Sequence, residues 1–332
     1  MTARHLKIVD GNNILHANHN GAKLTVGGPT GMQVQGIFGF LKSLKAMMSK
    51  TAGDKDVIVL FDGRAQWRLD IYPEYKGNRV QSTPEDQAHY EAFKRQVPYV
   101  QKALELLGVK TLRSPLLEAD DLAAHLVASV RRANEKLPPM ERTFIELVSG
   151  DKDWLQLVGP DVEWFDPIRD RRCSPENFLE FTGYHTPAEF VDGKCIQGDA
   201  GDNVTGIAGM GAKSAQEFLA TWHTVNNFFV ECDHNGHVPK SRKSKTATSL
   251  HPEQILASPE GRAMYARNVF LMDMSHCRKP VPGEVVVTAG KGDREKFLHF
   301  CERLAFASVL REQASFLAQF PNCKPVAVAT PA

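Results

Sequence analysis

Short apolar runs rich in β-branched residues alternate with longer stretches of helical periodicity, and this alternation constrains the fold more than any other feature. The runs are residues 6–9, 57–61, 109–112, 144–148 and 162–165. The predicted helices between them are residues 33–49, 85–107 and 115–134, the last with Ser114 as its N-cap and Pro115 as its first residue. Strands that alternate with helices predict an α/β domain with a mostly parallel, twisted central sheet flanked by helices.

The strand rhythm stops near residue 190, where glycine-rich turns and short helices take over. We therefore predict an α/β core over residues 1–190, a helical subdomain over 191–300, and a C-terminal helix and tail over 301–332. Residues 239–249 are basic and rich in hydroxyl groups, so the subdomain is expected to carry a basic loop over 232–249. Residues 322–332 are expected to form a frayed tail.

Composition and cysteine spacing narrow the class further. Hydrophobic residues make up 42% of the 332 residues and charged residues 24%, as in ordinary globular proteins. No apolar run is long enough to span a bilayer, and the start lacks a secretory apolar core, so we expect a cytoplasmic protein without membrane contacts. The six cysteines form no CxxC pair. Cys232, His234 and His237 could supply three zinc ligands, but no fourth lies at a zinc-site spacing, so a polar loop is favoured.

Acidic residues follow four of the predicted strands. They are Asp10, Asp62, the group Glu118, Asp120 and Asp121, and the pair Asp151 and Asp153. Taken alone, each of these acidic residues is typical of a turn or of a helix cap. Ligands of open parallel sheets bind beyond the carboxyl ends of the strands, so together these acids would crowd into one region. Each close pair of like charges costs about 4 kcal/mol at an effective dielectric constant near 20.

Divalent cations would keep such a cluster ionised. The expected ligands are all oxygen atoms, which favours Mg²⁺ or Mn²⁺ over zinc. Two ions suit in-line displacement at a phosphodiester, so the sequence predicts phosphodiester hydrolysis. Glu118 and Asp121 share a face of the predicted helix, but Asp120 does not. The three acids would therefore not all point to one metal site from a regular helix.

The net charge of +1 is a weak sign of nucleic-acid binding, but its distribution matters more. Setting aside nine acids of the predicted site, which include Asp199 and Asp202, leaves 40 basic residues against 30 acidic ones. A basic surface around an acidic site is therefore expected.

Six short motifs follow one another along residues 6–275. They are Ile8-Val-Asp-Gly-Asn12, Phe61-Asp62, Pro73-Glu-Tyr-Lys-Gly-Asn-Arg79, Glu118-Ala-Asp-Asp121, Ser149-Gly-Asp-Lys-Asp-Trp154 and Gly198-Asp-Ala-Gly-Asp-Asn203. In this order they resemble the 5′ nucleases, the family that includes bacteriophage flap endonucleases and the 5′-nuclease domain of bacterial DNA polymerase I. The resemblance implies a PIN-like 5′-nuclease fold and a Mg²⁺-dependent 5′-3′ exodeoxyribonuclease or flap endonuclease. No polymerase domain follows, which favours a stand-alone, phage-type enzyme in a bacterial host's cytoplasm.

The resemblance also implies roles for individual residues. Asp10, Asp62, Glu118 and Asp120 would serve one metal ion, Asp151, Asp153 and Asp202 the second, and Asp121 and Asp199 would assist. Lys76 would reach the scissile phosphate, Arg79 would add positive charge, and Tyr75 would be available for base stacking. A cation is needed where the transition state gathers charge. Residues from Val80 to about 100 resemble in position the helical arch through which a 5′ end passes.

The segment Gly206-Ile-Ala-Gly-Met-Gly-Ala-Lys-Ser-Ala215 resembles the helix-three-turn-helix of this family. Small residues allow close approach to DNA, and amides at the next helix start can hold a phosphate. The expected DNA-binding residues here are Lys194, Gly206, Gly209, Gly211 and Lys213, with Lys213 contacting the backbone without reading sequence. The family's turn can also hold K⁺. After Asp10, Leu15, His16 and Ala17 replace an aromatic residue and an arginine of some phage relatives.

The expected substrates are DNA with 5′ ends, flaps or nicks, and RNA–DNA hybrids are a further candidate, as in removal of RNA primers. We expect a monomer acting in phage replication or DNA degradation. Two alternatives remain. A PIN-type ribonuclease would not need the helical DNA clamp or residues 73–79, and a catalytically inactive DNA-junction binding protein would be expected to have lost metal ligands.

Overall fold

The computed structural model describes residues 4–21, 27–29, 31–49, 55–240 and 250–323. A seven-stranded sheet in the order β6-β5-β4-β1-β2-β3-β9 forms its centre. The strands are β1 (Arg4–Asp10), β2 (Lys55–Phe61), β3 (Lys110–Arg113), β4 (Thr143–Val148), β5 (Val162–Asp166), β6 (Arg171–Cys173) and β9 (Val286–Thr288). The pairs from β5 to β3 are parallel, and the two edge strands are antiparallel. The predicted mostly parallel sheet is confirmed, whereas β6 and β9 were not predicted.

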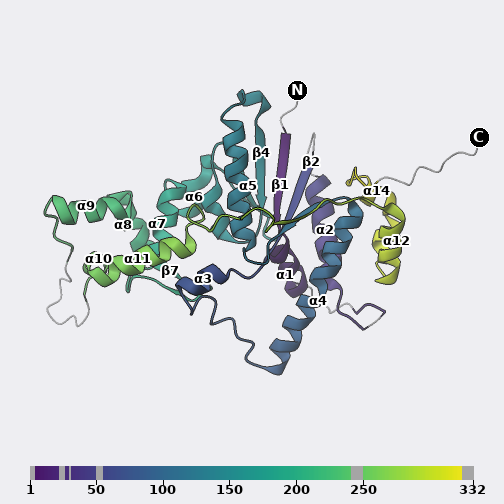
Figure 1. Cartoon of the computed structure of the whole chain (residues 1–332), viewed down its shortest axis with the longest axis horizontal. Helices are drawn as coiled ribbons and strands as arrows, with labels where there is room; N and C mark the ends of the chain where they lie inside the picture. The colour runs from purple at the N-terminus through teal and green to yellow at the C-terminus, as the bar shows by residue number, and fades with distance from the viewer. Residues whose placement is uncertain (1–3, 22–26, 30, 50–54, 241–249, 324–332) are drawn as a thin grey trace, which may run out of the picture.

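Helices cover both faces of this sheet (Figure 1). On one face lie α1 (Gly11–Gly21), α2 (Gln35–Ser49), α4 (Pro84–Leu107) and α12 (Arg294–Arg303); on the other lie α5 (Ala119–Asn134) and α7 (Pro187–Gln197). Successive strand residues point to opposite faces. In β1, Ile8 accordingly packs with the α5 side and Val9 with the α1 side, and both are fully buried.

Two predicted helices match closely, and the third starts later than expected. α2 and α4 cover nearly the predicted ranges, and α4 begins with a capping box between Thr83 and Asp86. Helix α5 begins at Ala119 with Glu118 as its N-cap, because the Asp121 carboxylate accepts a hydrogen bond from the Glu118 amide. The predicted start at Pro115 is therefore wrong, and Ser114 Oγ instead accepts from the Leu116 amide.

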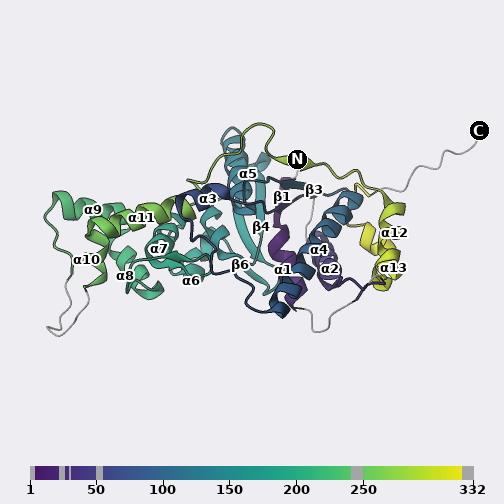
Figure 2. The same cartoon turned by 60° about the horizontal axis from the view of Figure 1, so that its bottom comes forward.

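The second half of the chain forms a helical region at one end of the molecule, as Figures 1 and 2 show. Its elements after α7 are β7 (Gly198–Asp199), β8 (Val204–Thr205), α8 (Ala212–Trp222), α9 (Val225–His234), α10 (Pro252–Ala257) and α11 (Pro259–Met272). The core between the sheet and α5 continues into this region through Phe190, Phe218 and Phe228. The predicted border at 190 falls inside α7.

The chain then returns to the α/β core. Strand β9 joins the sheet edge, and α12, α13 (Ala307–Arg311) and α14 (Gln313–Leu317) pack in the core beside α4. The predicted border at residue 300 is wrong, because it cuts α12 and assigns β9 to the wrong unit. The remaining elements are α3 (Gln66–Ile71), α6 (Phe178–Thr182), and the 3₁₀ turns η1 (Pro139–Glu141), η2 (Lys152–Leu157) and η3 (Pro175–Asn177).

The candidate zinc ligands do not converge. Cys232 and His234 lie in the last turn of α9, so the predicted loop at 232–249 starts inside a helix. The His237 ring packs edge-on against Trp222, with ring centroids 4.7 Å apart. Within the described ranges, no group of three or more His, Cys, Asp or Glu side chains could hold a metal ion as the side chains stand. Residues 241–249 and the tail after residue 323 lie outside the described residues.

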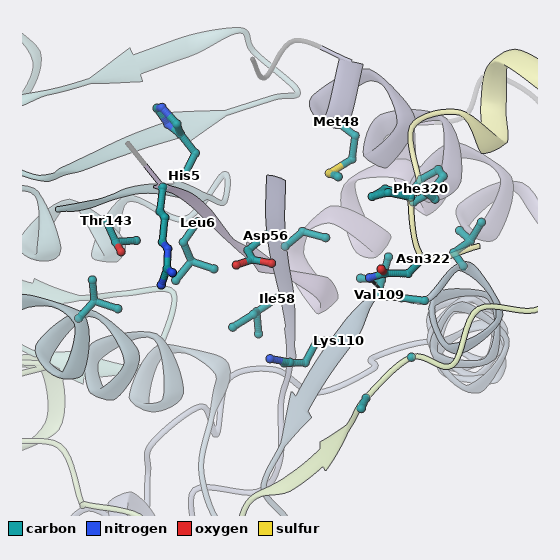
Figure 3. Close-up of a pocket in the computed structure, with 18 residues that line it drawn as sticks. His5, Leu6, Met48, Asp56, Ile58, Val109, Lys110, Thr143, Phe320 and Asn322 are labelled. Carbon is teal, nitrogen blue, oxygen red and sulfur yellow. Dashed lines mark hydrogen bonds between the residues drawn. The ribbon is translucent and has the colours of Figure 1, made fainter. Parts of the chain in front are cut away.

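A pocket of about 390 Å³ opens at the amino ends of the parallel strands (Figure 3). His5, Asp56, Lys110 and Thr143, each near the start of a different strand, line it. The acids discussed next lie at the opposite, carboxyl ends. None of the described helices is long and apolar enough to cross a membrane.

Candidate active site

Four aspartates from separate elements face one another beyond the carboxyl ends of the strands. Asp10 ends β1, Asp62 follows β2, Asp120 lies in the first turn of α5, and Asp151 follows β4. Asp10 is buried, Asp120 and Asp151 are half-buried, and Asp62 is exposed. The structure thus brings together acids that are up to 141 positions apart, as the strand-end argument predicts.

Their mutual repulsion appears in the pKa values. Burial, followed by the charges of Asp62 and Asp151, raises the pKa of Asp10 to about 8. Burial and the neighbouring Asp153 raise the pKa of Asp151 to about 6. Burial and the charge of Asp151 also raise the pKa of Asp120 well above its usual range. A bound cation would favour the charged form of these carboxylates and so lower their pKa values.

Hydrogen bonds from the surrounding elements position the acids. The Asn13 amide and Ser149 Oγ each donate to Asp10 over 2.9 Å. The Asp151 amide donates to the same Ser149 hydroxyl at 3.0 Å, so Ser149 joins the ends of β1 and β4. Ser149 stands in one of the sequence motifs, but the sequence assigns it no role.

Asp120 and Asp62 are fixed in a similar way. Trp154 Nε1 donates to Asp120 Oδ1 over 2.7 Å, and the Ala119 amide donates to Asp62 Oδ1 over 2.9 Å. The fully buried Trp154 ring thereby ties η2 to the start of α5. The motif containing Trp154 marks this residue, although the sequence does not reveal its partner.

Arg68 on α3 was missed by sequence reasoning, and it changes the interpretation of Asp121. Its guanidinium binds both oxygens of Asp121 and also Glu118 Oε2 at 2.9 Å, and all three residues are buried. The Glu118 amide donates to Asp121 as well. Asp121 is therefore bound by Arg68 and by the Glu118 amide, whereas the Asp120 carboxylate accepts a hydrogen bond from Trp154. Nothing in the sequence around Arg68 distinguishes it from a surface arginine.

Tyr75 is not available for base stacking, so this prediction is wrong. The side chain is buried, at 6% exposure, and its hydroxyl lies 3.0 Å from both Glu118 Oε2 and Asp202 Oδ2. Burial, with the charge of Glu118, raises the pKa of Tyr75. Here the turn that carries Tyr75 lies against the N-terminus of α5, where Glu118 is the N-cap.

Lys76 lies among the carboxylates. Its Nζ is 2.6 Å from Glu118 Oε1 and 3.7 Å from Asp202 Oδ2. Burial would lower the pKa of Lys76, but the charges of Glu118 and Asp202 hold it above its usual value. The backbone is fixed too, because Lys76 has a left-handed φ of 57° and its amide donates to the Asp202 carbonyl. The ammonium group is therefore held inside the acidic site.

Arg79 and Lys194 neutralise the acids nearest the helical region. The half-exposed Arg79 donates to Asp202 Oδ1. Lys194 Nζ binds Asp153 and, at 2.7 Å, Asp199 Oδ2. Asp199 Oδ1 accepts the amides of Gly201 and Asp202, so it shapes the turn that carries Asp202. Lys194 lies inside the site, and its predicted contact with DNA stays a prediction.

The donor set fits hard divalent cations. The acids at the strand ends offer only oxygen atoms, which Mg²⁺ and Mn²⁺ prefer. Burial and the neighbouring carboxylates raise the pKa values of Asp10 and Asp151, whereas the charges of Lys76 and Arg68 lower the pKa of Glu118 despite its burial. A divalent cation beside Asp10 and Asp151 would supply such positive charge.

The glycines of the predicted DNA-binding turn have different surroundings in the structure. Gly209 has φ 82°, a conformation that favours glycine. A Cβ on Gly206 would lie 2.1 Å from the Gln197 carbonyl oxygen, so Gly206 is required for packing against α7. Gly211 faces open space as the N-cap of α8, and Lys213 in the first turn is 89% exposed. Lys213 Nζ lies 4.0 Å from the exposed Glu217, and its side chain is accessible to a ligand.

The segment at residues 80–100 forms an exposed loop followed by the first half of α4. In Figure 1 this part projects beyond the body of the molecule, and its residues up to His89 are mostly exposed. Gln96 and Val100 are fully buried, so the second half of α4 belongs to the core. The projecting half lies next to Lys76 and Arg79 in the chain.

Comparisons with known proteins agree with this geometry. The family model for the 5′-3′ exonuclease, N-terminal resolvase-like domain matches residues 5–183. The thermostable DNA polymerase I of Thermus thermophilus is 31% identical over 284 residues, which are 85% of this chain and 30% of the polymerase. A 5′-3′ exonuclease of Buchnera aphidicola is 29% identical over 194 residues, 58% of this chain and 62% of that protein. The chain spans about a third of the length of the polymerases it matches.

Solved structures show the same fold. The flap endonuclease of bacteriophage T5, in a complex with DNA and metal ions, has a TM-score of 0.64 at 22% identity, with 95% of this chain and 99% of that chain covered. Fold and site together define a class, the α/β nuclease-like proteins that gather carboxylates at the ends of a mixed, mainly parallel sheet. Within that class, the chain belongs to the 5′-3′ exonuclease family. The resemblance drawn from the motifs is confirmed.

Proposed function

We propose that this protein hydrolyses phosphodiester bonds at 5′ ends or 5′ flaps of DNA with the help of two divalent metal ions. One observation carries the proposal. Asp10, Asp62, Asp120 and Asp151 face one another, and burial together with the neighbouring carboxylates raises the pKa values of Asp10 and Asp151. Mg²⁺ is the proposed ion, and Mn²⁺ would substitute for it.

The carboxylates divide between two ions in the proposal. Asp10, Asp62, Glu118 and Asp120 would hold one, and Asp151, Asp153 and Asp202 the other, with Asp199 assisting. Asp121 is left out, because Arg68 and the Glu118 amide occupy its oxygens. When bound, such ions activate a water molecule and stabilise the leaving oxygen.

The chain's own cations complete the site. Lys76 places an ammonium group beside Glu118, where it would stabilise the charge that develops on the scissile phosphate. Buried neighbours on several sides preorganise this lysine, so little rearrangement is needed on substrate binding. Arg79 would orient the strand from the outer side of the site.

The turn from Gly206 to Lys213 would hold the duplex through its backbone phosphates. The N-terminus of α8 presents amides and Lys213 to solvent, an arrangement suited to phosphate. A K⁺ ion held by the turn's carbonyls belongs to the same proposal. The proposal also includes acceptance of RNA–DNA hybrids as substrates and a role in phage replication or DNA degradation.

Cleavage assays separate this function from the two alternatives. The substrates are 5′-labelled duplex, 5′-flap, RNA–DNA hybrid and single-stranded RNA, each incubated with Mg²⁺ or with EDTA. Short products from the 5′ ends of DNA with Mg²⁺ alone support the proposal. Cleavage confined to RNA would indicate a PIN-type ribonuclease, and binding without cleavage would indicate an inactive junction-binding protein.

A further inference from the structure

Trp154 is a fully buried residue that links the two proposed groups of carboxylates. Its ring belongs to the core between the sheet and α5, and its indole nitrogen Nε1 donates to Asp120 Oδ1 over 2.7 Å. Trp154 lies in η2 directly after Asp153, whereas Asp120 lies in the first turn of α5. One side chain therefore joins an acid proposed for one ion to the turn that carries an acid proposed for the other.

Trp154 and Arg68 bind two successive acids of α5 in different ways. The indole N–H is an uncharged donor that cannot accept a hydrogen bond, so it fixes the Asp120 carboxylate without adding positive charge. Arg68 binds both oxygens of Asp121 with a guanidinium group, which neutralises that carboxylate. Of these two acids, Asp120 is therefore the one whose negative charge stays available to a cation.

The hydrogen bond from Trp154 also leaves one oxygen of Asp120 open. Trp154 binds Oδ1, and in the part of the chain that the structure describes no hydrogen bond reaches Oδ2. A carboxylate that is held through one oxygen presents the other in a defined direction. Hydrogen bonds that support a metal ligand in this way typically change metal affinity by roughly 10- to 100-fold.

A second buried tryptophan anchors the start of η2. Trp164 in β5 is fully buried, and its Nε1 donates to the Asp151 carbonyl over 3.0 Å. The Asp151 carboxylate in turn accepts the Asp153 amide over 2.8 Å. The beginning of η2 is thus fixed to the sheet, so the position of Trp154 is fixed relative to the strand ends, and Asp120 is held against it.

We propose that Trp154 is a positioning residue whose indole N–H orients Asp120 toward a divalent cation and thereby sets the affinity of the protein for that ion. The inference rests on the proposed function, which assigns Asp120 to one of two ions. It adds that an uncharged donor in the core controls this affinity. Loss of the N–H with the ring retained should weaken the binding of that ion and spare the other, because the acids of the second group keep their own contacts.

Mn²⁺ binding in the absence of DNA tests this without requiring cleavage. Trp154→Phe keeps an aromatic ring and removes the donor, and Trp154→3-benzothienylalanine keeps the size of the ring and replaces its N–H by sulfur. Trp222→Phe is the matched control, because the buried Trp222 Nε1 has no hydrogen-bond partner among the described residues. The electron paramagnetic resonance signal of free Mn²⁺ gives the number and affinity of bound ions. We expect two sites in the wild type, one of them weakened roughly tenfold in both variants at position 154 and unchanged in Trp222→Phe.

The same substitution in an Asp120→Asn background separates positioning from a general structural role. If Trp154 acts through Asp120, adding Trp154→Phe should change the remaining Mn²⁺ affinity by less than about twofold. A tenfold loss in that background, or wild-type affinity in both variants at position 154, overturns the proposal.

Circular dichroism shows whether each variant is folded, and the benzothienylalanine variant gives the answer if Trp154→Phe unfolds. A wild type that binds no Mn²⁺ overturns this proposal together with the proposed metal ions. Weakened Mn²⁺ binding in the variants, with no cleavage of DNA by the wild type, would defeat the proposed function alone.

Discussion

The guanidinium of Arg68 binds both carboxylate oxygens of Asp121, with nitrogen-to-oxygen distances of 3.1 and 2.7 Å. Both side chains are buried, and the residues are 53 positions apart. The pair fastens α3 to the first turn of α5, the turn that carries Asp120. An acid that looks like a metal ligand in the sequence therefore belongs to the scaffold that positions its neighbour.

Replacement of Arg68 should lower the free energy of unfolding of the protein. Arg68→Met leaves Asp121 buried without its cation, although Glu118 keeps Lys76, and breaking a buried pair costs about 3–5 kcal/mol. The free energy of unfolding in urea measures the loss. Arg64→Met, at an exposed arginine on the same segment, is the control and should change stability by less than about 0.5 kcal/mol. A loss below about 1 kcal/mol for Arg68→Met would show that the pair does not hold the site together.

The strands and the acids that follow them could be predicted from the sequence because each depends on local pattern. β-branched runs mark the strands, and parallel strands end at one edge, so Asp10, Asp62 and Asp151 had to meet. The edge strands β6 and β9 have three residues each, too few for a pattern to show. β9 also pairs with β3 across more than 170 positions, which local pattern does not reveal.

The partners of the acids could not be predicted, because they depend on tertiary contacts. Arg68, Ser149 and Trp154 bind carboxylates that follow other strands. Tyr75 was expected to be available for base stacking, but it is buried and its hydroxyl lies next to Glu118 and Asp202. The sequence motifs thus contain the acids that the fold brings together, whereas the side chains that bind these acids could be identified only in the structure.

A buried ion pair in the sheet should make stability depend on pH. Burial alone would raise the pKa of Glu146, but the hydrogen bond and charge of Lys7, with those of Arg172, lower it below the usual value of 4.5. The group is charged in the folded state at a pH where it would be protonated when unfolded. Its stabilising contribution is therefore complete above pH 4.5 and is lost as pH falls through the lower, folded pKa.

Urea unfolding of Glu146→Gln from pH 7 to pH 3.5 tests this. The variant should be less stable than the wild type by about 3 kcal/mol at pH 7, because Lys7 loses its partner in a buried place. The difference should narrow below pH 4.5. Glu141→Gln, at an exposed glutamate, should show no such narrowing. A difference that is constant down to pH 3.5 would contradict the assigned pKa direction.

Lys213 should contribute one phosphate contact. Lys213→Ala is expected to weaken binding to duplex and flap DNA uniformly across sequences and to lower the salt slope by about 1 unit. Fluorescence anisotropy over a series of salt concentrations gives the slope. Lys136→Ala removes an exposed lysine far from the turn and should leave it unchanged. The same slope in Lys213→Ala and wild type would place Lys213 outside the DNA interface.

Lys76 should act on the chemical step. Lys76→Ala removes an ammonium group held 2.6 Å from Glu118, and loss of one preorganised donor lowers the rate by roughly 10² to 10³. Single-turnover cleavage of a 5′-flap substrate in Mg²⁺ gives the rate, and anisotropy gives the affinity, which should change far less. Because transition-state contacts lower kcat and kcat/KM together, an effect on KM alone would make Lys76 a binding residue.

The proposed metal-dependent reaction is tested most directly at Asp151, which is close to both groups of carboxylates. Single-turnover cleavage of a 5′-labelled flap DNA is measured for wild type, Asp151→Asn, Asp153→Asn and the exposed control Glu180→Gln, with Mg²⁺ and with EDTA, alongside DNA affinity. Wild type and Glu180→Gln should cleave with Mg²⁺ and not with EDTA, while both aspartate variants bind DNA without cleaving it. Wild-type turnover by Asp151→Asn, or cleavage by the wild type in EDTA, would contradict the assignment of these carboxylates as metal ligands.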